Sequence, residues 1–129
     1  MTDAKHRDLK AERWRTFTLA EQMGNVGSEV SRTLKWRSRN PEIAERAMAR
    51  ALELIDLTLH DPRHRSSVGR LRELCRVREV LLDFLVGPNQ YGSTEAMLQR
   101  YFDAFAVAAR RATTDQTLAR ASTRNSTQL

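Results

Sequence analysis

Residues 18–34 read TLAEQMGNVGSEVSRTL, and this stretch decides the fold class. It opens with Thr18 and Glu21, a capping box in which each side chain can bind the other residue's free backbone N–H. Apolar side chains then recur every three or four residues, which places them on one face of a helix. These side chains are Leu19, Met23, Val26, Val30 and Leu34. The stretch predicts an amphipathic helix that begins after Thr18 and ends near Ser38.

Three further stretches show the same helical period between clear stop signals. Asn40-Pro41 supplies an N-cap residue and a proline at the first helical position, where its missing N–H costs nothing. The predicted second, third and fourth helices cover residues 41–60, 67–86 and 94–111. Because the helices are similar in length and joined by short connections, residues 18–111 predict an all-α, antiparallel, up-down-up-down four-helix bundle.

The segments outside this bundle are polar. Residues 1–17 predict a charged N-terminal arm; a short helix there would pack Trp14 and Phe17 on the mouth of the bundle. Residues 60–67 predict a polar connection between the second and third helices. Residues 112–129 lack apolar periodicity, so we expect a mostly disordered polar tail.

Composition limits the class of protein. The chain has 129 residues with only five glycines and three prolines, which fits one domain and disfavours a turn-rich β-sandwich or barrel. Its single cysteine excludes a disulfide framework and a multi-cysteine zinc site, and favours a reducing compartment. There is no apolar run of 18 residues, and the charged N-terminus lacks the apolar part of a signal peptide. We therefore expect a cytoplasmic protein with no membrane segment.

The net charge is +6, and nineteen of the 22 basic residues are arginine, which suits pairing with phosphate or carboxylate. The densest cluster lies at residues 63–72, where the free N–H groups of a helix start add to the positive potential. A second group surrounds Trp36. The side chains predicted to contact phosphate are Lys35, Arg37, Arg39, Arg63, Arg65, Arg70 and Arg72. His64 belongs to the same cluster at residues 63–72. The alternative is that all of these side chains are simply solvated.

Trp36 lies opposite the apolar stripe of the first helix. An exposed indole among cations can anchor a protein interface, be covered by the N-terminal arm near Trp14, or stack on a base. We name Trp36 as the candidate interface residue.

Arg78 falls within the apolar face of the third helix, between leucines. A buried guanidinium needs a carboxylate partner, and Asp56 is the first choice, followed by Glu29 and Glu53. The hypotheses are a structural ion pair, an arginine facing a partner subunit, and a ligand pocket.

Gly24 and Gly27 stand inside the first helix, beside Ser28 and Ser31. Glycine destabilises a helix by roughly 1 kcal/mol relative to alanine. The pattern therefore indicates close packing against the second or fourth helix, with a ligand slot as the alternative.

Catalytic patterns are missing. No His-Glu-x-x-His or Glu-x-x-His motif occurs, which argues against zincins and di-iron bundles. Cys75 is predicted to point inward as an inert core residue. We expect no enzyme activity, no metal and no cofactor.

Three stretches carry a resemblance: LAEQMGNVGSEVSR at residues 19–32, RALELIDLT at 50–58 and RVREVLLD at 76–83. They look like a group of small uncharacterised prokaryotic four-helix-bundle proteins. The layout is also similar to the 23S rRNA intervening-sequence proteins and to the accessory variability determinant of diversity-generating retroelements. That similarity implies a homo-oligomer, a pentamer in those two groups, and for the accessory protein binding of nucleic acid and a reverse transcriptase.

The sequence thus predicts a non-catalytic, self-associating accessory protein that binds RNA or DNA, with a nucleic-acid enzyme as a further partner. The second hypothesis is a protein-only interaction scaffold, in which Trp36 and the outer faces hold subunits or a partner. The third is a ligand-binding or catalytic bundle centred on Arg78. Binding that weakens steeply with salt would favour the first.

Overall fold

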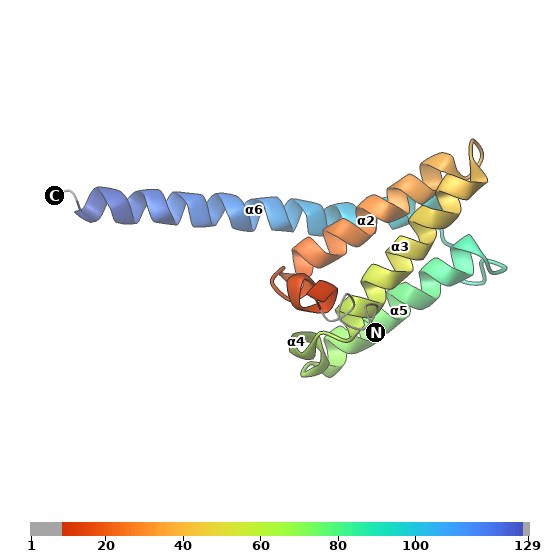
Figure 1. The fold of residues 1–129 in the computed structure, drawn as a ribbon, viewed down its shortest axis with the longest axis horizontal. Coiled ribbons are helices and arrows are strands. Elements are labelled where there is room, and N and C mark those ends of the chain that lie inside the picture. Colours follow the sequence, from red (N-terminus) through yellow and green to blue (C-terminus); the bar gives the residue numbers. More distant parts are fainter. Residues whose placement is uncertain (1–8, 128–129) are drawn as a thin grey trace.

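The computed structural model describes residues 9–127, with side chains to residue 123, and this part of the chain is helical without a strand. The helices are α2 (Leu19–Trp36), α3 (Pro41–Leu59), α4 (Pro62–Arg65), α5 (Val68–Leu85) and α6 (Glu95–Thr127). Residues 9–14 are also helical and precede α2. The long helices alternate in direction along the chain (Figure 1). The all-α prediction is confirmed.

The starts of α2 and α3 follow the local signals in the sequence. Thr18 Oγ1 accepts a hydrogen bond from the Glu21 backbone N–H at 3.1 Å, and Glu21 Oε1 accepts one from Thr18 N–H at 3.1 Å. Asn40 Oδ1 accepts a hydrogen bond from Ile43 N–H at 3.4 Å, and Pro41 takes the first helical position. These side chains satisfy donors that a helix start leaves free. Both predicted caps are confirmed.

Two segments differ from the prediction. Residues 62–65 form the short helix α4, capped by Asp61, inside the predicted polar connection. The expected disordered tail over residues 112–129 is not confirmed, because α6 continues to Thr127. No glycine or proline follows Gly92, so the sequence holds no stop signal for this helix. Residues 1–8 and 128–129, part of the predicted arm and tail, lie outside the described residues.

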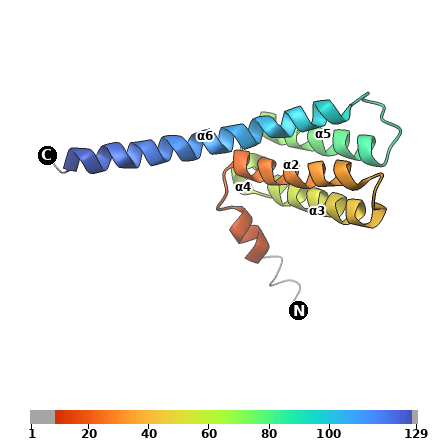
Figure 2. The same cartoon turned by 90° about the horizontal axis from the view of Figure 1, so that it is seen from above.

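Helix α2 is the centre of the packing, and Figure 2 shows it between α3 and α6. Its apolar stripe is buried against both neighbours. Gly27 makes the close approach to α6 possible, because a Cβ there would stand 2.5 Å from Phe102 Cβ. The glycine is therefore explained by helix packing and not by a ligand slot.

The helices do not close into the predicted bundle. Helix α5 packs on α3 and buries only Leu74 and Leu81 fully, while an open groove of about 350 Å³ separates it from α6. Cys75 is exposed, so its predicted inward position is wrong. The buried face of α5 is a narrow line one heptad long, and Cys75 lies 100° away from it on the helix. Met97 of α6 is 52% exposed in the α5–α6 groove.

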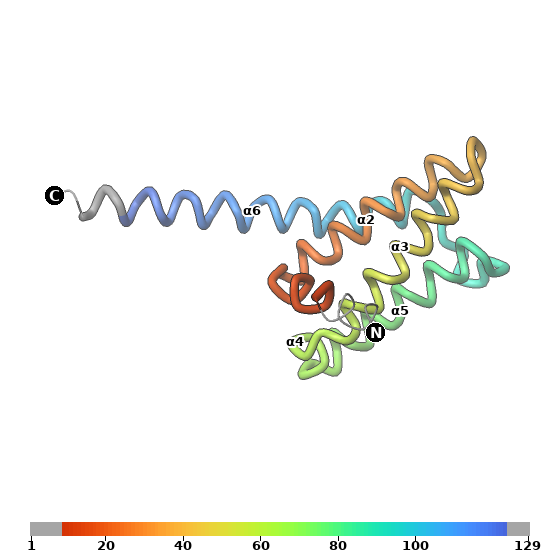
Figure 3. Tube along the Cα trace, in the orientation of Figure 1, coloured from red at the N-terminus to blue at the C-terminus, as the bar shows by residue number. Residues whose placement is uncertain are grey.

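The second half of α6 extends beyond the other described helices. The tube in Figure 3 shows it running past the N-terminal end of α2, where no other described helix lies beside it. Every described side chain from Arg110 to Thr123 is exposed. None of the helices in residues 9–127 combines the length and apolar composition that crossing a bilayer requires.

Candidate functional site

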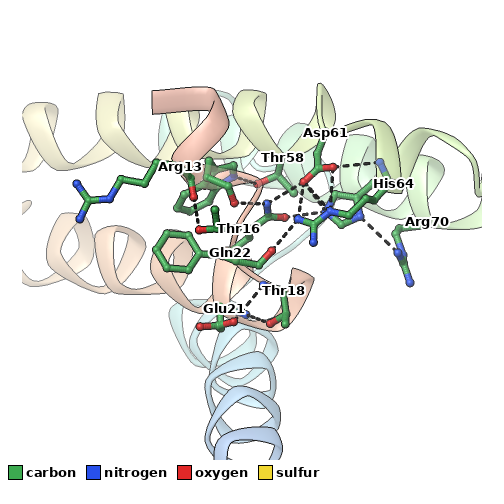
Figure 4. A network of polar contacts seen from close by, with 12 residues as sticks. Arg13, Thr16, Thr18, Glu21, Gln22, Thr58, Asp61, His64 and Arg70 are labelled. Carbon is green, nitrogen blue, oxygen red and sulfur yellow. Dashed lines mark hydrogen bonds and ion pairs between the residues drawn. The ribbon is translucent and has the colours of Figure 1, made fainter. Parts of the chain in front are cut away.

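A buried polar network joins the N-terminal arm to the end of α3 and to α4 (Figure 4). Gln22 of α2 stands at its centre and is fully buried. Its Nε2 donates hydrogen bonds to the Trp14 carbonyl at 2.9 Å and to Asp61 Oδ2 at 3.0 Å. Its Oε1 lies 2.7 Å from His64 Nε2. One amide therefore connects three separate segments of the chain.

Two further hydrogen bonds hold the arm. The indole Nε1 of Trp14 donates to Thr58 Oγ1 at 2.9 Å, and Arg63 Nη2 donates to the Phe17 carbonyl at 2.6 Å. Trp14 is buried and meets the ring of Phe17 edge to face at 5.7 Å. Trp14 and Phe17 thus pack on the end of the helix assembly, where the sequence places them.

Asp61 is the charged member of the network and is fully buried. The Arg63 side chain binds both carboxylate oxygens, with its Nη2 donating to Oδ2 at 2.7 Å. These hydrogen bonds, together with that of Gln22, lower the pKa of Asp61 well below its ordinary value of 3.8, against the opposing effect of burial. Asp61 also caps α4 by accepting from Arg63 N–H.

His64 is 1% exposed, so its predicted place in a solvated basic cluster is wrong. Burial lowers the pKa of its imidazole below the ordinary 6.5, although the Asp61 charge opposes this. Since the Gln22 amide nitrogen already faces two acceptors, its oxygen accepts from His64 Nε2–H. His64 Nδ1 then accepts from Arg70 Nη1 at 3.4 Å. This arrangement fits a neutral imidazole.

The network is structural: its hydrogen bonds hold the arm, α2, the end of α3 and α4 together. No buried side-chain polar atom in the described residues lacks a partner. The Asp61 and His64 side chains are 0% and 2% exposed, so no substrate can reach them. Between residues 9 and 127 no group of three or more His, Cys, Asp or Glu side chains could hold a metal ion.

The cations predicted to contact phosphate separate into two groups. Lys35, Arg37 and Arg39 lie at the end of α2, whereas residues 63–72 lie beyond the far end of α3. The 19 residues of α3 separate the groups by about 27 Å. The two groups therefore do not form one patch.

Several of these cations are engaged within the protein. Arg63 binds Asp61, Arg70 approaches His64, and the Arg37 guanidinium lies 5.2 Å from the centre of the Phe84 ring. Others are exposed and make no ion pair in the described residues; these are Lys35, Arg39, Arg65 and Arg72.

Trp36 is half-buried at the end of α2, with Lys35 Nζ 5.7 Å from the centre of its ring. Trp14 contacts the opposite end of α2, through Gln22. Fourteen residues of helix, or about 21 Å, separate Gln22 from Trp36. Cover of Trp36 by the arm is therefore excluded for residues 9–17.

Arg78 Nε donates a hydrogen bond to Asp56 Oδ1 at 2.8 Å, so Asp56 is its carboxylate partner. The pair is not buried: the two side chains are 37% and 46% exposed. Glu53 pairs with Lys10 instead, and Glu29 makes no ion pair among the described residues. The predicted buried centre is therefore an ion pair open to water.

A different cationic surface lies along α2 and α3, and we call it the basic groove. Its shallow part, of about 210 Å³, is lined by Arg32 of α2 and by Arg46 and Arg50 of α3, together with Glu29, Ile43 and Ala47. None of the three guanidinium groups makes an ion pair in the described part of the chain. Three arginines thus face one open channel.

Where the arm crosses α2 and α3, the basic groove deepens into a cavity of about 420 Å³, which we call the arm hollow. Glu29 and Arg50 line both parts, so the two are continuous. Lys10 and Arg13 add two cations from the arm. Lys10 Nζ lies 3.4 Å from Glu53 Oε1, whereas the Arg13 guanidinium points away from the polar network in Figure 4.

The basic groove cannot be predicted from the sequence, because its cations come from three segments that only the fold brings together. Arg46 and Arg50 are four residues apart, one turn of α3, which puts them on the same face. That spacing is the one signal the sequence offers; the positions of Arg32 and the arm follow only from packing.

Comparisons with known proteins found no matching family model, no matching curated protein and no matching solved structure. The groove and its charges are therefore the basis for a functional proposal.

Proposed function

We propose that the protein binds nucleic acid through the basic groove, without a catalytic step. The observation that supports this is the row of side chains Lys10, Arg13, Arg50, Arg32 and Arg46 along one concave surface. Glu29 and Glu53 are the only acidic side chains in that lining. Arginine pairs with phosphate through two parallel N–H donors, and four of these five cations are arginine.

The shape of the surface favours a polymer over a single small anion. Arg46 lies seven residues of α3, or about 10 Å, before Glu53, and Lys10 Nζ lies 3.4 Å from Glu53 Oε1. Cations spread over such a length match a ligand with repeated phosphates. The net charge of +6 on the whole chain adds to the positive field around the groove.

The experiment is a titration of labelled RNA and DNA oligonucleotides, single-stranded and duplex, followed by fluorescence anisotropy at several salt concentrations. Arg46→Gln with Arg50→Gln removes two unpaired cations of the basic groove. We expect weaker binding and a salt slope smaller by about 1.5, because each neutralised phosphate contributes roughly 0.7–0.9 to the slope.

Two matched variants remove the same charge elsewhere. Arg65→Gln with Arg72→Gln tests the cluster predicted from sequence around α4. Arg110→Gln with Arg111→Gln changes two exposed arginines on the free part of α6 and should bind as the wild type does. Equal loss in all three variants would reveal only a diffuse charge effect and reject the groove. Affinity unchanged from low to moderate salt would reject phosphate binding altogether.

A second candidate function is self-association, in which a helix of another copy would complete the predicted four-helix packing. The α5–α6 groove is apolar on α5 at Val77 and Val80 and on α6 at Met97 and Leu98. The α6 side chains from Arg110 to Leu118 are all exposed, and no other described helix packs on them, although isolated helices of this length are marginal in water. One chain thus offers both an apolar groove and an exposed helical segment that could enter the groove of another copy.

Sedimentation equilibrium tests this second function. Met97→Glu puts a charge inside the α5–α6 groove and should lower the mass of an oligomer. Val68→Glu, at a 67% exposed site at the start of α5, is the control and should leave the mass unchanged. A wild-type mass of 14.8 kDa at high protein concentration would exclude self-association.

A further inference from the structure

We infer that the nucleic acid in the basic groove is single-stranded and that one unpaired base occupies the arm hollow. This inference rests on the proposed function. It concerns the deep part of the groove, whose lining is not only cationic. The ring of Phe17 and the side chains of Leu54 and Leu57 form its apolar part, while Asn25 and Ser28 add polar groups from α2.

This mixed lining matches the chemistry of a nucleobase. A base has two apolar faces and an edge of hydrogen-bond donors and acceptors. Phe17 offers a ring for stacking. The Asn25 Nδ2 already donates to the Glu21 carbonyl at 2.9 Å, which leaves its second N–H and its oxygen for the edge of a base. The hollow, at about 420 Å³, lies within the range of about 300–1,000 Å³ typical of sites for small organic groups.

A duplex cannot use the hollow in this way. Its bases are stacked on each other, so their faces are covered, and moving one out of the helix requires unpairing and unstacking. A single strand carries no such cost, because its bases are already free to turn outward. The apolar part of the hollow therefore favours single-stranded over duplex nucleic acid, whereas cations alone would attract both forms.

The path of the backbone follows from the residues that the two parts share. Arg50 lines both the hollow and the shallow part of the basic groove. A strand with one base against Phe17 thus passes its phosphates by Arg50 toward Arg46 and Arg32. The base and its neighbouring phosphates are bound on one continuous surface.

Hydrogen bonds within the protein hold the arm side of the hollow in place. Trp14 Nε1 donates to Thr58 Oγ1 at 2.9 Å, and Arg63 Nη2 holds the Phe17 carbonyl at 2.6 Å. These bonds fix the arm across α2 and α3, so binding need not order it. The ion pair between Lys10 and Glu53 is exposed on both sides, and a phosphate can take the place of the carboxylate.

The first test is a competition measurement on the full-length protein. A labelled single-stranded oligonucleotide is displaced by unlabelled RNA or DNA of the same sequence, each offered as single strand and as duplex. We expect the single strands to compete at least about tenfold better than the duplexes. The RNA and DNA arms show which sugar is preferred. If no nucleic acid binds, the proposed function fails; if duplexes compete equally, only this inference is overturned.

The second test removes the ring with a matched control. Phe17→Leu keeps an apolar side chain in the hollow but abolishes stacking, and we expect single-strand affinity to fall about fivefold or more. Phe105→Leu makes the same change on α6, where the ring is also partly buried and also meets another aromatic edge to face. A thermal unfolding measurement on each variant checks that it folds. Equal affinity of the two variants would overturn the placement of a base against Phe17.

Discussion

Gly27 of α2 lies directly against Phe102 of α6, so close that an added Cβ would stand 2.5 Å from the Phe102 Cβ and 3.1 Å from its Cγ. Phe102 is itself 3% exposed, so its ring has little room to move away. The contact fixes the distance between two of the long helices.

Gly27→Ala should therefore destabilise the fold by roughly 1–3 kcal/mol, because overpacking outweighs the better helix propensity of alanine. Gly24→Ala is the matched control. A Cβ at Gly24 would lie 3.7 Å from Ala106 Cα, an ordinary contact, and the change should stabilise by about 0.5–1 kcal/mol. Urea denaturation measures both. A stabilised Gly27→Ala variant would show that α2 and α6 do not pack this way.

Gln22→Leu should destabilise the protein by roughly 2–5 kcal/mol. The change leaves the Trp14 carbonyl and His64 Nε2–H buried without their partner, and each such group costs about 1–3 kcal/mol. Asn25→Leu is the same substitution at an exposed site one turn later and should change stability by about 0.5 kcal/mol or less. Similar losses in the two variants would contradict the buried network.

Stability should fall as the pH is lowered from 7 to 5 because of His64. Its folded pKa lies below the ordinary 6.5, so below that pH the unfolded chain binds a proton that the folded one does not. Asp61, whose pKa is also lowered, adds a further loss as the pH falls below 3.8. Chemical denaturation at a series of pH values gives the slope.

His64→Gln should flatten that slope between pH 7 and 5, even though the variant is less stable overall. Leu81→Ala is the control: it also destabilises the fold, because it removes a fully buried side chain, but it changes no titratable group and should keep the slope of the wild type. An unchanged slope in His64→Gln would mean that the imidazole is not buried in neutral form.

The ion pair of Asp56 and Arg78 should contribute little. Both side chains are more than one-third exposed, and exposed pairs contribute about 0–1 kcal/mol. Asp56→Asn and Arg78→Leu should each shift the urea midpoint only slightly. A loss above about 2 kcal/mol for Asp56→Asn would indicate a pair that is desolvated in solution.

The parts of the fold that are set by residues adjacent in the chain can be predicted from the sequence. The capping box of Thr18 and Glu21 and the Asn40-Pro41 start are local signals, so the bounds of α2 and α3 are predicted within a residue or two. The wheel of α5 likewise places Arg78 toward α3 and its carboxylate. The exposed Cys75 is missed because the width of a buried face depends on how many helices cover it.

The parts that depend on packing do not follow from the sequence. Gln22 lies three residues after Leu19 and four before Val26, so the helical period puts it on the apolar face. Only the arm, α3 and α4 folded around it make it the centre of a network. The basic groove has the same origin, since its cations are distant in the sequence. Helix α6 illustrates the reverse case: the prediction of a disordered tail depends on the missing apolar stripe, although no residue there stops a helix.

The part of α6 from Arg110 to Thr127 extends about 25 Å, which exceeds the radius of gyration of about 14 Å for a whole compact chain of this length. Such a rod gives a single subunit a large Stokes radius and a high frictional ratio. Gel filtration would therefore overstate its mass, and a monomer would elute as if it were an assembly. Subunit number has to be taken from a method that does not depend on shape.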